Sequence, residues 1–231
     1  MYLPNHSMTK YTADDFNQII ISKGYNSKSQ SVMYGEGASF IASQDKYGVN
    51  AMLTFAAALN ESASGTSWIA KNKNNLFGHG AYDSCPKECA TTYATVADSV
   101  LAHAKMTGQG YNDPSDWRFY GSHYGNKASG MNVKYATDPY WGEKAASNAF
   151  NNDKKFGSQD FKSNTIGVKT VINSVPVKKE PKESSSVIYN LKNNSYNVEK
   201  IPLIVFDKIT ANGYDWYKVY TDVALDDNQN K

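Results

Sequence analysis

The chain has 231 residues, a formal net charge of +2 and an ordinary apolar content, and its 17 tyrosines stand out. This length is sufficient for one buried core, with or without a small companion domain. Nearly all the cations are lysines, and Arg118 is the single arginine. Nucleic-acid recognition usually requires arginine forks and a clustered basic face, so we expect no nucleic-acid partner. Tyr and Trp combine an apolar ring face with a polar edge, which suits carbohydrate binding as well as an ordinary core.

The sequence gives no indication of membrane insertion. No apolar run approaches the roughly 18 residues that a membrane span requires, so we expect none. The first residues, MYLPNHSMTK, lack the apolar stretch of a signal peptide. Either export information lies outside this chain, or the chain is part of a virion or a larger polypeptide. We expect a monomer unless it belongs to such an assembly.

Two cysteines, Cys85 and Cys89, lie together in the motif CPKEC. A zinc site requires further ligands at suitable spacing, and the histidines show no such pattern, so we expect no metal and no cofactor. The four histidines are His6, His79, His103 and His123. Two readings of the cysteines remain open, a short disulfide that shapes a surface loop and a pair of free thiols, and we favour the disulfide.

Helical periodicity dominates the first 150 residues. Thr12 is a plausible N-cap for the first helix, and Gly48 is a plausible end for the second. The expected helices are 11–21, a segment that ends at Gly48, 50–61, a brief helix at 68–71, 91–106 and 139–150. Between them, Gly-, Ser- and Asn-rich segments predict loops and short strands.

The segment 50–61, NAMLTFAAALNE, is almost entirely apolar and predicts a buried helix. Glu61 at its end is therefore conspicuous. A carboxylate that leaves a buried helix must be solvated, paired or perturbed in its pKa.

The pattern changes at about residue 157, where helical spacing gives way to short β-rich runs broken by Pro, Gly and Asn. We place a boundary at 157–165, with one domain over residues 1–160 and a small β module over residues 161–231.

The runs AAALNESASGTSWIAKNKNNLFG and AYDS, followed by NKASGMNVKYATDPYWGEKAA, resemble the glucosaminidase family of peptidoglycan hydrolases (glycoside hydrolase family 73 type). This family includes autolysins of Gram-positive bacteria, phage lysins and flagellar wall-cutting proteins. The resemblance covers about residues 35–150, in two blocks of the expected order. It implies an α+β fold class, with a mainly helical, lysozyme-like catalytic domain that carries a small β-lobe. It also implies hydrolysis of the bond after N-acetylglucosamine in the glycan strand of peptidoglycan.

Within this resemblance Glu61 occupies the position of the general acid. A carboxyl group at the end of an apolar helix, facing a cleft, has its pKa raised by desolvation, as a proton donor requires. Relatives often carry an aromatic residue two positions after the acid, where this chain has Ala63. This departure thins the apolar wall beside Glu61.

The second catalytic group has several candidates. Asp98 matches an acidic position of several relatives, but a solvated Asp at a helix start that only favours the helix dipole is an equal alternative. Some relatives lack this residue, and the N-acetyl group of the substrate then assists instead. Asp83 and Glu88 are weaker candidates. The expected mechanism is accordingly inverting or substrate-assisted.

Aromatic residues are the main candidates for the substrate site. Tyr135, in KYATDPYW, matches a family tyrosine beside the acid, and we count it with the catalytic residues. For Phe77 and Trp141 three roles remain open: contact with sugar, shaping of the cleft, or packing in the core. Asn75, like its neighbour Asn74, is typical of a turn. The candidate substrate-binding residues are Asn75, Phe77, Tyr82, Tyr140 and Trp141.

The C-terminal runs VPVKKEPKESSSVIYNL and NGYDWYKVY resemble a bacterial SH3-like wall-binding domain. The strand expected next is missing before the end at VALDDNQNK, so we expect an incomplete module.

Together these features predict a peptidoglycan-cleaving glycoside hydrolase, secreted, associated with the cell wall or carried by a virion. A muramidase or lytic transglycosylase acting on the same strands is the first alternative. A non-catalytic wall-binding or virion structural protein is the second, although such a protein has no chemical need for Glu61 and the Asn-Asn-Leu-Phe-Gly run that follows it.

Overall fold

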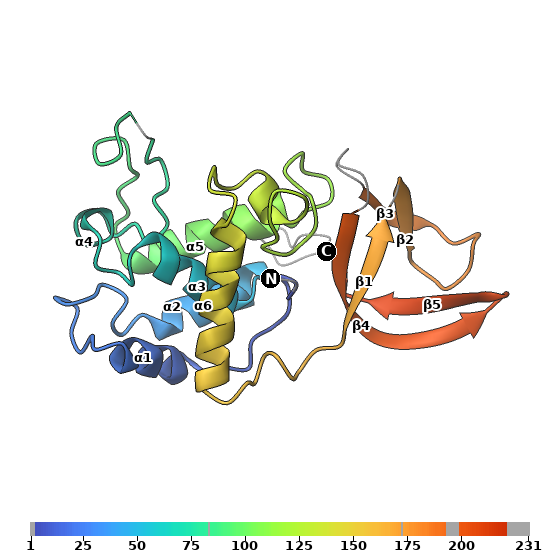
Figure 1. Ribbon diagram of the computed structural model, residues 1–231, viewed down its shortest axis with the longest axis horizontal. Helices are drawn as coiled ribbons and strands as arrows, with labels where there is room; N and C mark the ends of the chain where they lie inside the picture. Colours follow the sequence, from blue (N-terminus) through green and yellow to red (C-terminus); the bar gives the residue numbers. More distant parts are fainter. Residues whose placement is uncertain (1–2, 83, 172, 193–198, 221–231) are drawn as a thin grey trace. The chain divides into compact units, whose positions relative to one another are not determined.

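We describe the protein from a computed structural model, which covers residues 3–82, 84–171, 173–192 and 199–220. The chain forms helices in its first two thirds and strands in its last third (Figure 1). None of the helices in these ranges combines the length and the apolar character needed to cross a membrane.

Six α-helices lie at or near the predicted positions. In chain order they are α1 (Ala13–Ser22), α2 (Gly37–Tyr47), α3 (Ala51–Glu61), α4 (Trp68–Lys73), α5 (Val96–Met106) and α6 (Trp141–Lys155). Two short helices accompany them, the π-helix η1 (Thr107–Tyr111), which directly continues α5, and the 3-10 helix η2 (Met131–Val133). Thr12 caps α1 in a capping box with Asp15, and Gly48 ends α2 in the left-handed conformation, as the sequence predicts.

The chain divides into two compact units, which are described separately below. The helical unit comprises residues 8–107 and 144–162. The mixed unit comprises, within the described ranges, residues 3–7, 108–143 and 163–220. The change of pattern predicted at 157–165 falls between the end of α6 and the first strand. The predicted division into two domains at residue 160 stays a prediction.

The core of the helical unit contains a cluster of three phenylalanines. Phe16 of α1, Phe40 of α2 and Phe55 of α3 are fully buried, and their ring centroids lie 4.9 to 6.1 Å apart. Such tilted and edge-on contacts are favourable arrangements for aromatic rings. Helices α1, α2 and α3 are therefore packed around a common centre, and α5 contacts both α2 and α3.

A buried carboxylate, Asp153, connects the two ends of the helical unit. It lies on α6, and its Oδ1 accepts hydrogen bonds from the Tyr11 hydroxyl at 2.7 Å and from the Asp160 backbone N–H at 3.0 Å. Its Oδ2 accepts one from the Phe161 N–H at 3.0 Å. Burial, together with the hydrogen bond to Asp153, raises the pKa of Tyr11. The segment before α1 and the segment after α6 are thus held by the same side chain.

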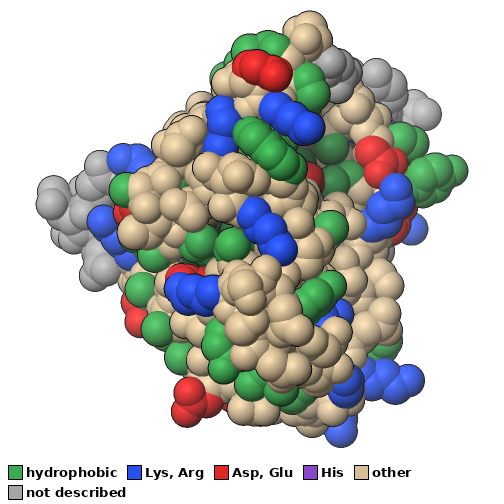
Figure 2. All heavy atoms as spheres, turned by 90° about the vertical axis from the view of Figure 1, so that its left-hand side faces the viewer, with side chains coloured by type: hydrophobic (Ala, Val, Ile, Leu, Met, Phe, Trp, Pro, Cys, Tyr) green, Lys and Arg blue, Asp and Glu red, His purple; other side chains and the backbone are tan. Residues whose placement is uncertain are grey.

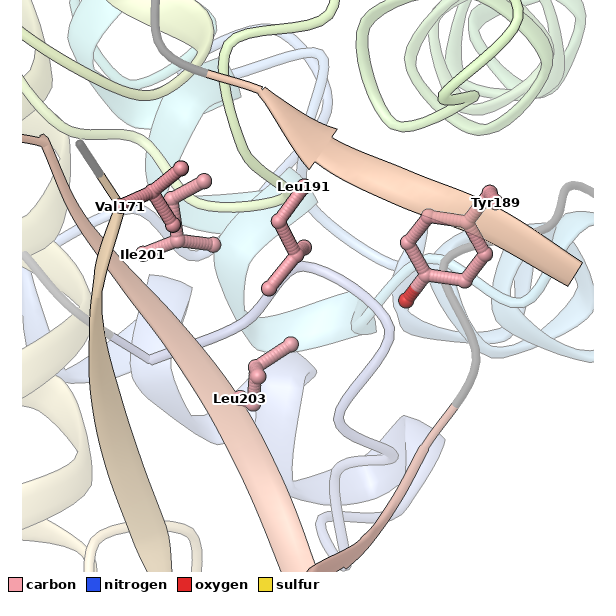
Figure 3. Packing of buried hydrophobic residues seen from close by; sticks show 5 residues of the cluster. All are labelled: Val171, Tyr189, Leu191, Ile201 and Leu203. Carbon is pink, nitrogen blue, oxygen red and sulfur yellow. The ribbon is translucent and has the colours of Figure 1, made fainter. Parts of the chain in front are cut away.

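Five strands form a small antiparallel region in the mixed unit. They are β1 (Ile166–Val171), β2 (Ser174–Lys178), β3 (Val187–Lys192), β4 (Glu199–Ala211) and β5 (Tyr214–Val219). One sheet has the order β1-β4-β5, and β2 pairs with β3 in the other. Figure 3 shows how side chains from β1, β3 and β4 meet. This cluster consists of Val171, Tyr189, Leu191, Ile201 and Leu203.

The alternation of side chains along the strands explains this β core. Tyr189 and Leu191 are two residues apart on β3, and Ile201 and Leu203 are two residues apart on β4, so each pair points to one face of its strand. The predicted small β region is confirmed, and its strands pair antiparallel, whereas its SH3-like identity is not established by them. Residues 221–231, on which the prediction of an incomplete module depends, lie outside the described ranges.

The expected β-lobe of the catalytic domain is not built from strands in the described residues before 166. Two isolated bridges occur there, Pro4 with His123 and Tyr82 with Cys85. The Gly- and Asn-rich loop between α4 and α5 is instead held by side-chain hydrogen bonds to backbone groups, described below.

Replacement of Asp153 by Ala tests the role of this carboxylate in the helical unit. The change removes the acceptor for one hydroxyl and two backbone N–H groups, so we expect the free energy of unfolding to fall by about 3 kcal/mol or more. Urea unfolding followed by circular dichroism measures the loss. Tyr11→Phe removes only one of the three donors and should cost about 1 kcal/mol. Equal losses in the two variants would contradict this account.

Candidate active site

Helix α3 places Glu61 at the edge of the helical core. Asn50 caps the helix through a hydrogen bond from the Leu53 N–H at 3.0 Å, and every residue from Ala51 to Leu59 is buried. Asn60 and Glu61, the last two residues, are partly exposed. The helix therefore carries its first carboxylate at the point where it leaves the apolar interior, as the sequence predicts.

The turn after Glu61 has an unusual backbone. Ala63, Ser64 and Gly65 have positive φ angles of 50°, 58° and 76°. Non-glycine residues adopt this left-handed region at a cost, and such strain persists only where the surroundings hold it in place. An observed strained turn directly after a candidate catalytic residue is consistent with a position that is fixed for function.

Hydrogen bonds hold this turn on both sides. The Ser62 hydroxyl donates to the Ala58 carbonyl and accepts from the Gly65 N–H. From a neighbouring segment, the Ser31 hydroxyl donates to the Ser64 carbonyl at 2.7 Å, and the Val32 N–H donates to the Gly65 carbonyl at 3.1 Å. A Cβ atom on Gly65 would lie 2.6 Å from the Ser31 hydroxyl, so glycine is required there. The end of α3 is consequently fixed in position.

Ala63 lies at the exposed tip of this turn. At its φ of 50° an aromatic side chain would be strained. The absence of the aromatic residue that relatives often have here thus accompanies a tight, left-handed turn in this chain.

Asn75 organises the loop that follows α4. Its side-chain nitrogen donates to the carbonyls of His79 and Thr91, both at 2.9 Å, and its Oδ1 accepts from the N–H groups of Phe77 and His79. Asn75 is buried. Asn74 before it has a φ of 50°, and its side chain donates to the carbonyls of Tyr93 and Ala94, just before α5. These bonds agree with the expected turn-forming role, while substrate contact by Asn75 stays a prediction.

A stack of aromatic rings lies behind this loop. Phe77 and His103 are parallel, with centroids 3.8 Å apart. The His79 Nε2 lies 3.3 Å from the His103 Nδ1, and the His79 Nδ1 lies 2.8 Å from the Tyr93 hydroxyl. Burial lowers the pKa of His79 to about 4, and burial together with the neighbouring His79 lowers the pKa of His103 well below the usual range of histidine. Both histidines are therefore neutral at pH 7.

Sequence reasoning considered these histidines only as metal ligands and missed their pairing. The available signal was His103, which lies among the apolar positions of α5 and is fully buried there. Among the described residues no group of three or more His, Cys, Asp or Glu side chains could hold a metal ion.

The loop between α4 and α5 carries Tyr82, whose side chain is 65% exposed. A disulfide joins Cys85 and Cys89 with a Cα–Cα distance of 5.5 Å, which confirms the favoured reading of the cysteines. The Lys73 ammonium donates to the carbonyls of Glu88 and Ala90, and so attaches the far side of the loop to the end of α4. Tyr82 is thus presented to solvent by a loop that is closed at several points.

The candidates for the second carboxylate have different surroundings. Asp98 is exposed and forms a capping box at the start of α5, where its Oδ2 accepts from the Thr95 N–H and hydroxyl at 3.0 and 2.8 Å. The side chain of Glu88 is also exposed, and Asp83 lies outside the described residues. Asp98 therefore has a structural function at the helix start, and its catalytic function stays a prediction.

The remaining candidates belong to the mixed unit. The Tyr135 ring lies 4.2 Å from the Trp141 ring and 5.6 Å from the Tyr111 ring, between centroids. Trp141 also contacts Tyr124 and is buried, whereas Tyr140 is 64% exposed. Tyr135, which is partly exposed, is consequently held between aromatic neighbours.

Polar contacts fix the backbone around Tyr135. The buried Asn132 side chain donates to the carbonyls of Asp138 and Pro139, both at 3.1 Å. The Lys127 ammonium donates to the carbonyls of Asn132 and Ala136. The segment that carries Tyr135 is therefore closed on itself.

Comparison with known proteins identifies the family. Residues 37–154, just over half of the chain, match the glucosaminidase family model, which is described as mannosyl-glycoprotein endo-beta-N-acetylglucosaminidase. The chain belongs to this family of glycoside hydrolases, which confirms the resemblance found in the sequence. The matched region includes Glu61, Asp98, Tyr135 and the five candidate substrate-binding residues.

Several relatives share this region. The chain is 38% identical over 152 residues to a candidate endo-beta-N-acetylglucosaminidase of Streptococcus pneumoniae, and this match covers 66% of the chain and 22% of that protein. It is 30% identical over 149 residues to a bifunctional autolysin of Staphylococcus aureus, and this match covers 55% of the chain and 11% of the autolysin. The chain thus spans about a fifth or less of the length of these relatives.

Solved structures show a weaker likeness. A catalytic mutant of S. aureus autolysin E, in complex with the disaccharide NAG-NAM, is 22% identical with a TM-score of 0.47, over 68% of this chain and 72% of the other. The major bifunctional autolysin is 25% identical with a TM-score of 0.44, over 68% and 67% of the two chains.

Replacement of Asn75 by Ala tests the organisation of the loop. Two backbone carbonyls and two N–H groups lose their side-chain partner, so we expect the free energy of unfolding to fall by about 3 kcal/mol or more. Asn74→Gly is the matched control, because glycine relieves the left-handed backbone there, and it should cost less than about 1 kcal/mol. Thermal unfolding of both variants gives the comparison, and similar losses would contradict the role of Asn75.

The buried histidine pair predicts a dependence of stability on pH. In the unfolded chain His79 takes up a proton as the pH falls below the ordinary His pKa of about 6.5. In the folded chain it takes up this proton only near its lowered pKa of about 4, so the unfolded chain binds more protons between these two values. The free energy of unfolding should therefore fall as the pH decreases between these values. In His79→Gln the fall should be shallower, as measured by urea unfolding from pH 7.5 to 4.5. An unchanged slope would exclude His79 as its source.

Proposed function

We propose that this chain hydrolyses the glycosidic bond after N-acetylglucosamine in the glycan strands of peptidoglycan, with Glu61 as the general acid. The observation that carries this proposal is the position of Glu61 within the family match. It is the first carboxylate after a run of nine buried helical residues, and a strained, hydrogen-bonded turn follows it directly. The relatives named above, a candidate endo-beta-N-acetylglucosaminidase and an autolysin, support the same substrate class.

A fixed carboxyl group at the edge of an apolar core suits general acid catalysis. The acid must lie within hydrogen-bond reach of the leaving-group oxygen, and small displacements lower the rate strongly. Ser62, Ser31 and Gly65 fix the backbone that follows Glu61. These contacts restrain the backbone beside Glu61, which supports its proposed role as the proton donor.

The surroundings of Asp98 favour a mechanism in which it is not the second catalytic group. Its Oδ2 already caps α5 through Thr95, which supports assistance by the N-acetyl group of the substrate or by a water molecule. In this mechanism Tyr135, held between Tyr111 and Trp141, steadies the N-acetyl group or the developing charge on the sugar. Tyr82 and Tyr140, which are well exposed, contact neighbouring sugars.

The surface agrees with a carbohydrate partner rather than a nucleic acid. On the face seen in Figure 2, Lys and Arg side chains are dispersed among hydrophobic and uncharged ones and do not gather into one basic patch. The small β region with the Val171, Leu191 and Ile201 core serves, in this proposal, as an SH3-like wall-binding module. The chain then acts at the bacterial cell wall, from a secreted protein or a virion.

Replacement of Glu61 by Gln tests the proposed acid. The amide cannot donate a proton to the leaving group, so we expect release of reducing ends from purified peptidoglycan to fall by at least about 100-fold, with a melting temperature near that of the wild type. Asp98→Asn is the matched control and should keep most of the activity. Retained activity in Glu61→Gln would overturn the assignment.

Mass spectrometry of the products of the wild-type protein tests the bond that is cut. N-acetylglucosamine at the reducing ends is the expected result. N-acetylmuramic acid or its anhydro form there would identify a muramidase or a lytic transglycosylase instead.

A further inference from the structure

The mixed unit carries an exposed aromatic cluster that the proposed mechanism does not use. Trp117 is 72% exposed, and the Lys134 ammonium lies 5.7 Å from its ring centroid and 5.5 Å from that of Tyr120. We name these three residues, Trp117, Tyr120 and Lys134, the Trp117 cluster. Distances of this size allow a cation–π interaction with each ring.

The loop that presents Trp117 is held firmly. Asp113 Oδ1 accepts from the Ser115 N–H and hydroxyl, both at 2.8 Å. Asp116 forms a two-point ion pair with Arg118, at 2.8 Å from Nε and 2.7 Å from a terminal nitrogen, and it also accepts from the Arg118 backbone N–H. Trp117 lies between these paired residues. Its outward position is therefore set by the loop.

Arg118 attaches this loop to the interior of the mixed unit. Its guanidinium carbon lies 5.0 Å from the centroid of the Tyr111 ring. A Cβ atom on Gly110 would lie 2.4 Å from a terminal nitrogen of Arg118, so the guanidinium lies directly against the backbone at this glycine. The loop is thus packed against η1.

A rigidly held Trp that exposes most of its surface contributes little to folding. Burial of apolar area stabilises a fold, and most of the apolar surface of Trp117 is not buried. Exposed aromatic residues on ordered loops commonly mark binding sites, because the ring face is already presented without further loss of entropy. The cluster also carries a positive charge on Lys134, which points to a ligand with both an apolar face and an anionic group.

We propose that the Trp117 cluster is a binding site for the glycan strand of peptidoglycan, in which Trp117 stacks on a sugar ring and Lys134 pairs with a carboxylate attached to N-acetylmuramic acid. This inference rests on the proposed function. Sugar rings offer the C–H face that stacks on an indole, and N-acetylmuramic acid carries carboxylates that N-acetylglucosamine lacks. Two sources of carboxylate exist. The lactyl group is a free carboxylate where no stem peptide is attached, and where a peptide is joined to it through an amide bond, the peptide supplies its own carboxylates.

The position of Lys134 connects the cluster to the proposed catalytic group. Lys134 and Tyr135 are consecutive residues at the end of η2, and both of their N–H groups donate to the Met131 carbonyl, at 3.2 and 3.0 Å. Their Cα atoms are therefore about 3.8 Å apart. Lys134 extends to Trp117 and Tyr120, whereas Tyr135 packs on Tyr111 and Trp141. A strand bound at the cluster thus lies beside the backbone that positions Tyr135.

Binding to three ligands, measured by calorimetry with the intact Glu61→Gln protein, tests this site. The ligands are a neutral N-acetylglucosamine oligomer, glycan strands freed of stem peptides by an amidase, and strands with stem peptides. Trp117→Ala should weaken binding to all three by about tenfold, the loss expected for one aromatic stacking contact. Phe161→Ala, which removes an aromatic side chain that is 67% exposed outside the cluster, is the matched control and should leave binding unchanged.

Variants of Lys134 distinguish the anionic group. Lys134→Met should leave binding to the neutral oligomer within about twofold and weaken binding to the anionic strands by about two- to fivefold, less at high salt. Lys134→Arg should restore it. A loss confined to strands with stem peptides assigns the carboxylate to the peptide, and a loss confined to the amidase-treated strands assigns it to the lactyl group, which is a free carboxylate only there. A loss on both anionic ligands shows that Lys134 pairs with either carboxylate.

Two outcomes would overturn the inference. Unchanged binding in Trp117→Ala excludes the stacking contact, and an equal loss on neutral and anionic ligands in Lys134→Met excludes the carboxylate pairing. Failure of the proposed function is distinct, because the wild-type protein would then release no reducing ends from peptidoglycan, whatever residue stands at position 117.

Discussion

The burial of α3 is the constraint on which the rest of the structure depends. Nine consecutive residues of this helix are buried, with at most 4% of any of them exposed, so other elements must surround it on every side. Phe16 and Phe40 provide part of this cover from α1 and α2, and α5 contributes from another side. A helix of this kind has to end where a charged side chain appears, because an isolated ionised carboxylate in the core is costly. The same fact that organises the core therefore places Glu61 at its boundary.

Polar side chains determine the shape of what surrounds this core. Asn75 supplies four hydrogen bonds to the backbone of the loop after α4, and Asp153 supplies three to the segments at the two ends of the helical unit. These segments have little regular structure of their own, so their backbone groups require partners from side chains. Loops fixed in this way can present groups such as Tyr82 in one position, which a binding site requires.

The sequence was sufficient for the elements with strong periodicity and insufficient for the contacts between distant segments. Helix α3 and its terminal Glu61 followed from an almost entirely apolar run, and Thr12 and Gly48 followed from local capping rules. The pairing of His79 with His103 depends on how a loop lies on α5, and the bond from Tyr11 to Asp153 joins residues 142 positions apart. No local pattern encodes such contacts. Asp98 shows the remaining difficulty, because a capping Asp and a catalytic Asp have the same sequence signature at a helix start.

Solvent exposure separates the aromatic candidates in a way that the sequence does not. Phe77 and Trp141 are buried, where they stack on His103 and brace Tyr135, so they shape the site from within the protein. Tyr82 and Tyr140 expose most of their side chains, as does Trp117, which the sequence did not single out as a candidate. A sugar ring can stack only on a face that the fold leaves open. In the proposed function, the residues that contact the glycan are therefore those that the fold exposes on anchored loops. Trp141 acts there by packing against Tyr135, whereas Phe77 packs on His103.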